Sequence, residues 1–111
     1  MGLEVQGGYK MNIRAEIHKN ICRELNEVYR AKNSDYGNSF TKVREEYPQA
    51  ILIRLMDKLE RLKTLYNGRE RLVKDESIDD TLKDLANYCI MELVERRLER
   101  TPAVKELLEN E

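Results

Sequence analysis

Residues 48–68, PQAILIRLMDKLERLKTLYNG, decide the fold. Apolar side chains recur in this stretch at steps of three and four residues: Leu52, Leu55, Leu59, Leu62 and Tyr66. That spacing places them along one side of a helix. Pro48 suits the first turn of a helix, and Asn67 followed by Gly68 is a typical stop. The stretch therefore predicts an amphipathic helix over residues 48–66, with its apolar stripe in the core.

An apolar stripe of the same kind lies upstream. It predicts a helix over residues 12–32, with these side chains on its buried side: Ile13, Ile17, Ile21, Leu25 and Val28. Turn-forming residues follow at 33–39, where Gly37 is free to take a positive φ, and they predict the end of this helix. The residues between this turn and Pro48 are expected to form a short connecting segment.

A third stripe lies downstream and predicts a helix over residues 77–100: Ile78, Leu82, Leu85, Cys89 and Leu93. Ser77 is a favourable N-cap, and Asp80 takes the third helical position of a capping-box pattern. The charged stretch over residues 92–100 alternates Glu and Arg as a water-facing helix surface does. Thr101 and Pro102 then predict the cap and first residue of a short C-terminal helix over residues 102–108.

Three long helices and a short one predict an all-α fold, a small helical bundle. The chain has 111 residues, enough for one domain, which we expect over residues 12–111. Residues 1–11 are expected to be a flexible leader, since they contain three glycines and no helical period, and Met11 is an alternative start. Because three amphipathic helices make a thin core, we expect oligomerisation to complete a bundle of four or more helices.

Composition excludes several function classes. The chain carries 20 basic and 21 acidic residues, so it lacks the basic footprint that duplex nucleic acid requires. No apolar run approaches the roughly 20 residues of a membrane span, and no signal peptide is apparent. We expect a cytoplasmic protein. Cys22 and Cys89 lie in apolar helical patterns, which predicts two reduced, buried core residues.

Acidic and basic residues gather on the polar sides of two predicted helices. At about 100° per residue, Arg54, Asp57 and Arg61 project opposite the leucine stripe of residues 48–66, with Lys58 at the margin. In the third long helix the side opposite the apolar stripe holds four residues: Asp80, Asp84, Asn87 and Met91. Asp80 and Asp84 are one turn apart, close enough to share a cation.

Carboxylates at this spacing are the oxygen ligands that Mg²⁺ prefers, with water and substrate phosphates completing its shell. Such an ion stabilises charge on a phosphoryl oxygen and activates an attacking water. Four basic residues could supply counter-charge to a phosphate chain: Lys32, Arg54, Lys58 and Arg61. The pattern indicates a nucleotide-handling site.

Simpler interpretations of the same residues stay open. The acidic sides can be solvated surfaces, Asp80 can act only as a capping residue, and Arg54 and Arg61 can pair with Asp57 and Glu60 on their own helix. His18 is the only histidine and is expected at the surface, so a zinc site has no ligand set. No phosphate-binding loop, dinucleotide motif or Ser/Cys–His nucleophile pattern occurs.

Three blocks in order resemble a known family. They are residues 32–40 (KNSDYGNSF), 53–62 (IRLMDKLERL) and 74–88 (KDESIDDTLKDLANY). The set resembles the phage and bacterial "nucleotide modification associated domain 1" family, which is similar to the MazG-like all-α nucleoside triphosphate pyrophosphatases. That resemblance implies a homodimer or homotetramer. It also implies hydrolysis of a nucleoside triphosphate to monophosphate and pyrophosphate, with Mg²⁺, or Mn²⁺ in its place.

The resemblance also implies residue roles. The metal ligands would be Asp57, Glu60, Asp80 and Asp84, with Asp57, Asp80 and Asp84 catalytic. The phosphate contacts would be Lys32, Arg54, Lys58 and Arg61, and the nucleoside end would be shaped by Asp35, Tyr36, Asn87 and Tyr88. The superfamily has Glu-x-x-Glu and Glu-x-x-Asp on successive helices. Here the first becomes Asp57–Glu60, and the second becomes Asp80–Asp84 with one extra residue; Glu76 and Asp79 have the ordinary spacing.

Three hypotheses follow from these residues. The first is a metal-dependent nucleotide pyrophosphohydrolase. The second is a protein that binds or sequesters a nucleotide in the same pocket without turnover. The third is a helical interaction module, in which the acidic stripe forms a salt-bridged subunit contact.

Overall fold

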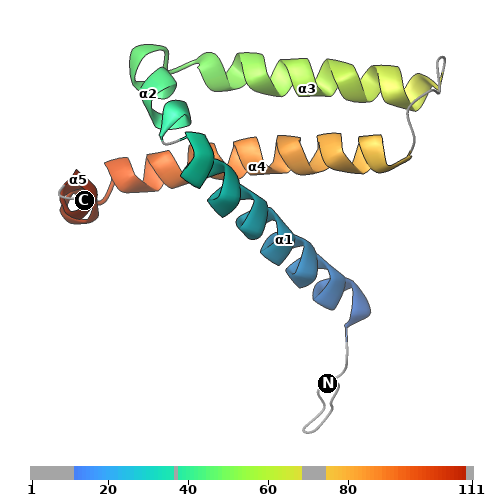
Figure 1. Cartoon of the computed structure of the whole chain (residues 1–111), viewed down its shortest axis with the longest axis horizontal. Coiled ribbons are helices and arrows are strands. Elements are labelled where there is room, and N and C mark those ends of the chain that lie inside the picture. The colour runs from blue at the N-terminus through green and yellow to red at the C-terminus, as the bar shows by residue number, and fades with distance from the viewer. Residues whose placement is uncertain (1–11, 37, 69–74, 110–111) are drawn as a thin grey trace, which may run out of the picture. The chain divides into compact units, whose positions relative to one another are not determined.

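The computed structural model describes residues 12–36, 38–68 and 75–109. The predicted leader, residues 1–11, lies outside them. The described residues form five helices and no strand, which confirms the all-α fold class (Figure 1). The helices are α1 (Ile13–Tyr36), α2 (Ser39–Glu46), α3 (Ala50–Asn67), α4 (Asp75–Glu99) and α5 (Pro102–Glu109). The chain divides into two units, residues 1–37 and 38–111.

The first unit contains α1. Its N-terminus is capped by Asn12, whose Oδ1 accepts a hydrogen bond from the backbone N–H of Ala15 at 2.9 Å. The helix continues to Tyr36, so the predicted end after residue 32 is wrong. Asn, Ser and Asp each disfavour a helix by only a few tenths of a kcal/mol, which a helix already formed can absorb. Of the predicted apolar stripe, Leu25 is buried and the other members are exposed.

The second unit is organised around an antiparallel hairpin of α3 and α4, which lie side by side (Figure 1). Its core cluster consists of Leu62, Leu65 and Ile78, with the partly buried Leu85 packed against them. Gly68 ends α3 with a φ of 68°, and its N–H donates to the carbonyl of Leu65 at 3.2 Å. Only glycine adopts this left-handed conformation without cost, so the predicted stop is confirmed.

Three side-chain contacts fix the register of the hairpin. Arg61 Nε donates to Thr81 Oγ1 at 3.3 Å, and Lys58 Nζ lies 3.3 Å from Asp84 Oδ2. One turn further along, Arg54 Nη1 donates to the Tyr88 hydroxyl at 3.4 Å. Each step back by three or four residues on α3 is matched by a step forward on α4, as antiparallel helices require. Arg54, Lys58 and Arg61 therefore lie on the side of α3 that contacts α4, together with the buried Leu62 and Leu65.

The exposure of the leucine stripe corrects the predicted core. Of the predicted stripe on α3, Leu62 is buried and Leu55 is half-buried, but the other three members are exposed: Leu52, Leu59 and Tyr66. Leu65, outside the predicted stripe, is buried. Cys22 and Cys89 are free thiols, as expected, but both are exposed, so their predicted burial is wrong. Periodicity identifies an apolar side of a helix, and the packing within one chain decides whether that side is covered.

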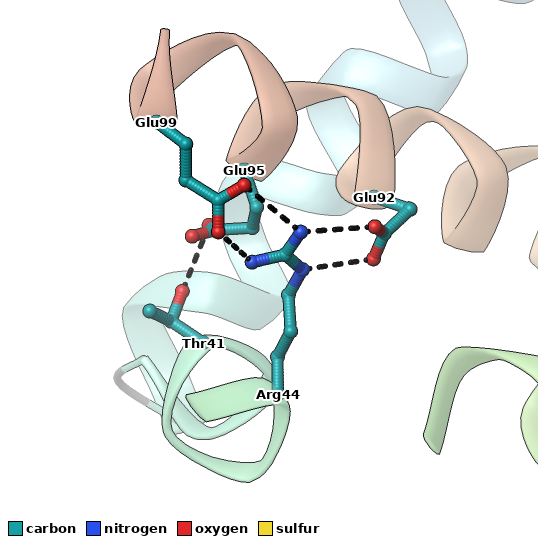
Figure 2. Close-up of polar contacts among 5 residues, drawn as sticks. All are labelled: Thr41, Arg44, Glu92, Glu95 and Glu99. Carbon is teal, nitrogen blue, oxygen red and sulfur yellow. Dashed lines mark hydrogen bonds and ion pairs between the residues drawn. The ribbon is translucent and has the colours of Figure 1, made fainter. Parts of the chain in front are cut away.

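Helix α2 was not predicted from the sequence. Its contacts with α4 explain why this short segment is helical. Thr41 Oγ1 donates to Glu95 Oε2 at 2.9 Å, and Arg44 contacts both Glu92 and Glu99 (Figure 2). The side chain of its N-cap residue makes no capping hydrogen bond. Because an isolated eight-residue helix is marginal in water, these tertiary contacts stabilise it.

The other helix starts differ from the sequence expectations in detail. α3 begins at Ala50 after a turn at Pro48, and α4 begins at Asp75, so Ser77 lies inside the helix and is not its N-cap. α5 begins at Pro102, as predicted. The Thr101 hydroxyl donates back to the carbonyl of Arg97 at 2.7 Å. No helix among the described residues is long and apolar enough to cross a membrane.

Candidate functional site

A pocket of about 680 Å³ opens on one side of the α3–α4 hairpin. It is lined by residues of both helices: Asp57, Lys58, Glu60, Arg61, Thr64, Leu65, Asp80, Thr81 and Asp84. The hairpin register explains this composition, because Lys58 and Arg61 are the α3 residues that meet Asp84 and Thr81 of α4. Only Leu65 contributes an apolar side chain to the lining.

The pocket brings together the four acids that the resemblance implies. Asp57 and Glu60 come from α3, and Asp80 and Asp84 come from α4. Asp57, Glu60 and Asp80 are exposed, and Asp84 is half-buried. Their carboxylates therefore remain accessible to a solute from solvent. Their roles as metal ligands and catalytic groups stay predictions.

The two basic residues in the pocket lining, both on α3, contact polar side chains of α4. Lys58 forms an ion pair with Asp84, in which both side chains are only partly exposed. Arg61 donates to the hydroxyl of Thr81, a residue that is 3% exposed. Each cation thus contacts a group on the facing helix, and Lys58 neutralises one of the predicted metal ligands.

The i,i+3 and i,i+4 pairs suggested for α3 differ from those in the structure. Glu60 forms an ion pair with Lys63 at 3.0 Å, and both side chains are exposed. Arg54 and Arg61 reach instead toward Tyr88 and Thr81 of α4. Because exposed pairs on one helix contribute little, Glu60 can exchange partners at small cost.

The four acids suit a metal ion in the type of their ligand atoms, but not in the present positions of their side chains. The donor set fits Mg²⁺, because carboxylate oxygens are its preferred protein ligands. Among residues 12–36, 38–68 and 75–109, no three His, Cys, Asp or Glu side chains lie together as a metal-holding group. Binding an ion therefore requires the acids to turn toward one another and Asp84 to share or leave Lys58.

An aromatic cluster lies one helical turn beyond the Lys58–Asp84 pair. The Arg54 guanidinium lies over the Tyr88 ring, 5.5 Å from its centroid. Phe40 of α2 adds a tilted ring whose centroid is 6.4 Å from that of Tyr88. Two residues predicted for substrate binding, Arg54 and Tyr88, are thus brought together, and Asn87 is half-buried on the same helix. Phe40 was not predicted for the site, although it ends the first block of the resemblance.

The remaining predicted residues belong to α1. Lys32 is exposed there, and Asp35 and Tyr36 form its last turn, with their side chains outside the described residues. Their predicted contacts with phosphate and nucleoside remain predictions.

The α2–α4 contact centres on Arg44, which is held between two carboxylates (Figure 2). Its Nε and Nη2 donate to the two oxygens of Glu92 at 2.9 and 3.0 Å, and Nη1 donates to Glu99 at 2.6 Å. Hydrogen bonds to Glu92 and then Glu99 raise the pKa of Arg44 despite partial burial. The same hydrogen bond from Arg44 lowers the pKa of Glu99. The stretch expected to face water therefore binds α2 on one side.

The family comparison covers this same hairpin. The family model described as nucleotide modification associated domain 1 matches residues 32–95. No curated protein and no solved structure matches the chain. The matched region contains all of α3, the four acids of the pocket and the α4 residues that face them. Since the match covers more than half of the chain, the protein belongs to the nucleotide modification associated domain 1 family.

Proposed function

We propose that the protein is a nucleoside triphosphate pyrophosphohydrolase that depends on Mg²⁺, acting in the pocket beside α3 and α4. The observation that carries the proposal is the composition of this pocket, where four carboxylates from two helices lie with Lys58 and Arg61. The resemblance to MazG-like pyrophosphatases supports it, because their chemistry uses acids on successive helices. The family assignment is consistent with a nucleotide substrate.

The basic residues of the pocket have a direct role in this proposal. A triphosphate brings several negative charges, and Lys58 and Arg61 are the cations in the pocket lining that can receive them. When a phosphate draws the Lys58 ammonium away, the ion pair between Lys58 and Asp84 opens. Substrate entry would thereby prepare Asp84 for a new cation.

The acids then take the second role. Asp57, Asp80 and Asp84 would hold the ion, with Glu60 as a further oxygen ligand at the solvent side. Such an ion, when bound there, would supply positive charge to a phosphate oxygen and favour the deprotonation of a water. One turn along the hairpin, Arg54 would contact a phosphate and Tyr88 would contact the nucleoside.

The proposal is tested with a panel of nucleoside and deoxynucleoside triphosphates incubated with protein and Mg²⁺, with chromatographic separation of products. We expect monophosphate and pyrophosphate, lost on chelation. Asp84→Asn should lower kcat by at least about 100-fold with an unchanged circular dichroism spectrum. Glu106→Gln is the control, because Glu106 of α5 is exposed and is absent from the pocket lining. Unchanged turnover in Asp84→Asn would refute the proposal, and so would equal losses in both variants.

A second function is favoured by the Lys58–Asp84 ion pair. That pair occupies one predicted ligand, and no described group of three acids is placed to hold a metal. We infer as an alternative a nucleotide-binding protein without turnover, in which Lys58 and Arg61 bind phosphates directly. Titration calorimetry with and without Mg²⁺ separates the two. Tight binding that ignores chelation, with the nucleotide recovered intact, supports the alternative. Thermal stability that ignores both Mg²⁺ and nucleotides points to an interaction module.

A further inference from the structure

Helix α1 carries a histidine and a cysteine one turn apart on its surface. His18 is the single histidine of the chain, and Cys22 follows it by four residues. The Cys22 sulfur lies 3.8 Å from Nδ1 of His18, and both residues are exposed. The pocket beside α3 and α4 uses neither of them.

The distance between these two donor atoms is close to the one that a bound metal ion requires. In a tetrahedral site a zinc ion lies about 2.3 Å from a thiolate sulfur and about 2.0 Å from an imidazole nitrogen. With a tetrahedral angle at the metal, the sulfur and the nitrogen are then about 3.5 Å apart. The observed separation of 3.8 Å exceeds this by about 0.3 Å, which a small rotation of the Cys22 side chain removes.

The spacing of the two residues is also suited to one ion. Residues four positions apart lie on the same side of a helix, and two histidines at this spacing hold zinc in helical metalloprotease motifs. A cysteine at the second position supplies a thiolate, which borderline and soft cations favour. Because both residues belong to α1, the helix itself sets the distance between the two ligands.

We propose that His18 and Cys22 bind a borderline-soft divalent cation such as Zn²⁺, through Nδ1 and the thiolate sulfur. Binding breaks the S–H bond of Cys22, forms a sulfur–metal bond and releases the proton to solvent. His18 binds as the neutral imidazole, with its remaining proton on Nε2. Two protein ligands leave the other positions of the ion to water, so the site is open and exchangeable, unlike a structural zinc site with four protein ligands.

This site and the pocket suit different ions. Sulfur and imidazole nitrogen bind Zn²⁺ and related transition metals, whereas Mg²⁺ prefers oxygen ligands and keeps several of its waters. Mg²⁺ at the pocket acids therefore does not compete with Zn²⁺ on α1. Binding of Zn²⁺ by His18 and Cys22 is thus independent of nucleotide hydrolysis, and either can fail without the other.

Two basic residues of α1 oppose the binding of a cation only weakly. Arg14 lies one turn before His18, and Lys19 lies three residues before Cys22. Both are exposed, so their long side chains can extend into water, which screens their repulsion of the ion. The Cys22 thiolate is in direct contact with the ion, and its attraction exceeds this repulsion.

The test is a titration of the full chain with Co²⁺, which takes the same ligands as Zn²⁺ and absorbs light. We expect a sulfur-to-cobalt charge-transfer band in the near ultraviolet, which Zn²⁺ abolishes and Mg²⁺ leaves unchanged. Cys22→Ser should abolish the band, and His18→Gln should raise the dissociation constant about tenfold, since one of two ligands is lost. Both positions are exposed, so these variants should fold as the wild type does.

Cys89→Ser is the matched control, because Cys89 is also a free, exposed thiol but lies on α4. It should keep the band. The absence of a band in the wild type overturns the proposal. A band that Cys22→Ser leaves unchanged, or a dissociation constant that His18→Gln leaves unchanged, also overturns it.

A measurement on the unaltered chain needs no variant. Alkylation of each thiol by iodoacetamide is followed by mass spectrometry of peptides, with and without Zn²⁺. We expect Zn²⁺ to slow the alkylation of Cys22 about tenfold, because a sulfur bonded to zinc is no longer a free thiolate. The rate at Cys89 should stay the same, and Mg²⁺ should slow neither reaction. Equal protection of the two thiols by Zn²⁺ would show nonspecific thiol binding and overturn the proposal.

Discussion

The Lys58 ammonium lies 3.3 Å from the Asp84 carboxylate, across the contact between α3 and α4. A residue expected to bind phosphate is thus paired with a residue expected to bind metal. Both side chains are partly exposed, so the pair contributes only about 0.5 kcal/mol to stability. This is small beside the free energy of binding a multiply charged nucleotide. The pair can therefore open when a ligand enters, and it holds the two charges in place until then.

Removing Lys58 should change metal and nucleotide binding in opposite directions. Lys58→Met removes a positive charge that lies 3.3 Å from the Asp84 carboxylate, so we expect Mn²⁺ to bind severalfold more tightly in the absence of nucleotide. The affinity for a triphosphate should fall about tenfold, since a phosphate contact is lost. Titration calorimetry measures both. Lys42→Met, at an exposed position of α2, is the control. If the Lys58→Met variant binds Mn²⁺ no more tightly than this control does, Lys58 and Mn²⁺ do not compete for Asp84.

The small core predicts a large loss of stability at one position. Leu65→Ala should lower the free energy of unfolding by about 2–4 kcal/mol, because it removes a member of the three-residue cluster with Leu62 and Ile78. Urea denaturation followed by circular dichroism measures the change. Leu107→Ala, on an exposed leucine of α5, should cost less than about 0.5 kcal/mol. A similar loss in both variants would mean that the core lies elsewhere.

The stacking of Arg54 on Tyr88 predicts an order of effects. Arg54→Met should cost about 0.5–1 kcal/mol, because the guanidinium over the ring is lost. Tyr88→Phe should cost less, since the ring stays and the hydrogen bond to its hydroxyl is long at 3.4 Å. Thermal unfolding of the two variants measures the order. A larger loss in Tyr88→Phe would show that the hydroxyl, and not the ring face, is the important contact.

The Arg44–Glu99 contact predicts a dependence of stability on acid. Hydrogen bonding to Arg44 lowers the pKa of Glu99 below its ordinary value of 4.5. The stabilisation is therefore fully present above pH 4.5 and is lost as the pH falls through the lowered pKa. Glu99→Gln should melt at a lower temperature than the wild type at pH 6, and the difference should shrink toward pH 3. Glu45→Gln, exposed on α2, should show no such trend. A difference that is constant with pH would exclude the ionic contribution.

Periodicity was a sound guide to where α3 lies and a poor guide to which side of it is covered. Leu62 of the leucine stripe is buried in the core, as predicted, but Leu52 and Leu59 of the same stripe are exposed. Arg54, Lys58 and Arg61 instead lie against α4 and use their polar ends to contact Tyr88, Asp84 and Thr81. Long basic side chains pack their stems against a neighbouring helix, and hydropathy alone does not show this.

The same limit explains the helix that was missed. The α2 sequence has only two large apolar residues, Phe40 and Val43, and it is held by polar contacts with residues about fifty positions away. Arg44 and Glu92 cannot be paired from the sequence, because nothing local links them. By contrast, the gathering of Asp80 and Asp84 on one side of a helix follows from their spacing alone, and both line the pocket. Local spacing could be predicted, and contacts between distant helices could not.

The register of the hairpin limits how such a protein can change over evolution. Deleting one residue within α4 between Thr81 and Asp84 would rotate everything after it by about 100°. The contacts of Lys58 and of Arg54 with α4 would then be lost together, and Asp84 would leave the pocket. A substitution at one pocket acid removes at most one of the three contacts that fix the register. We therefore expect members of this family to vary their chemistry by exchanging side chains at fixed positions, and to keep the lengths of these two helices nearly constant.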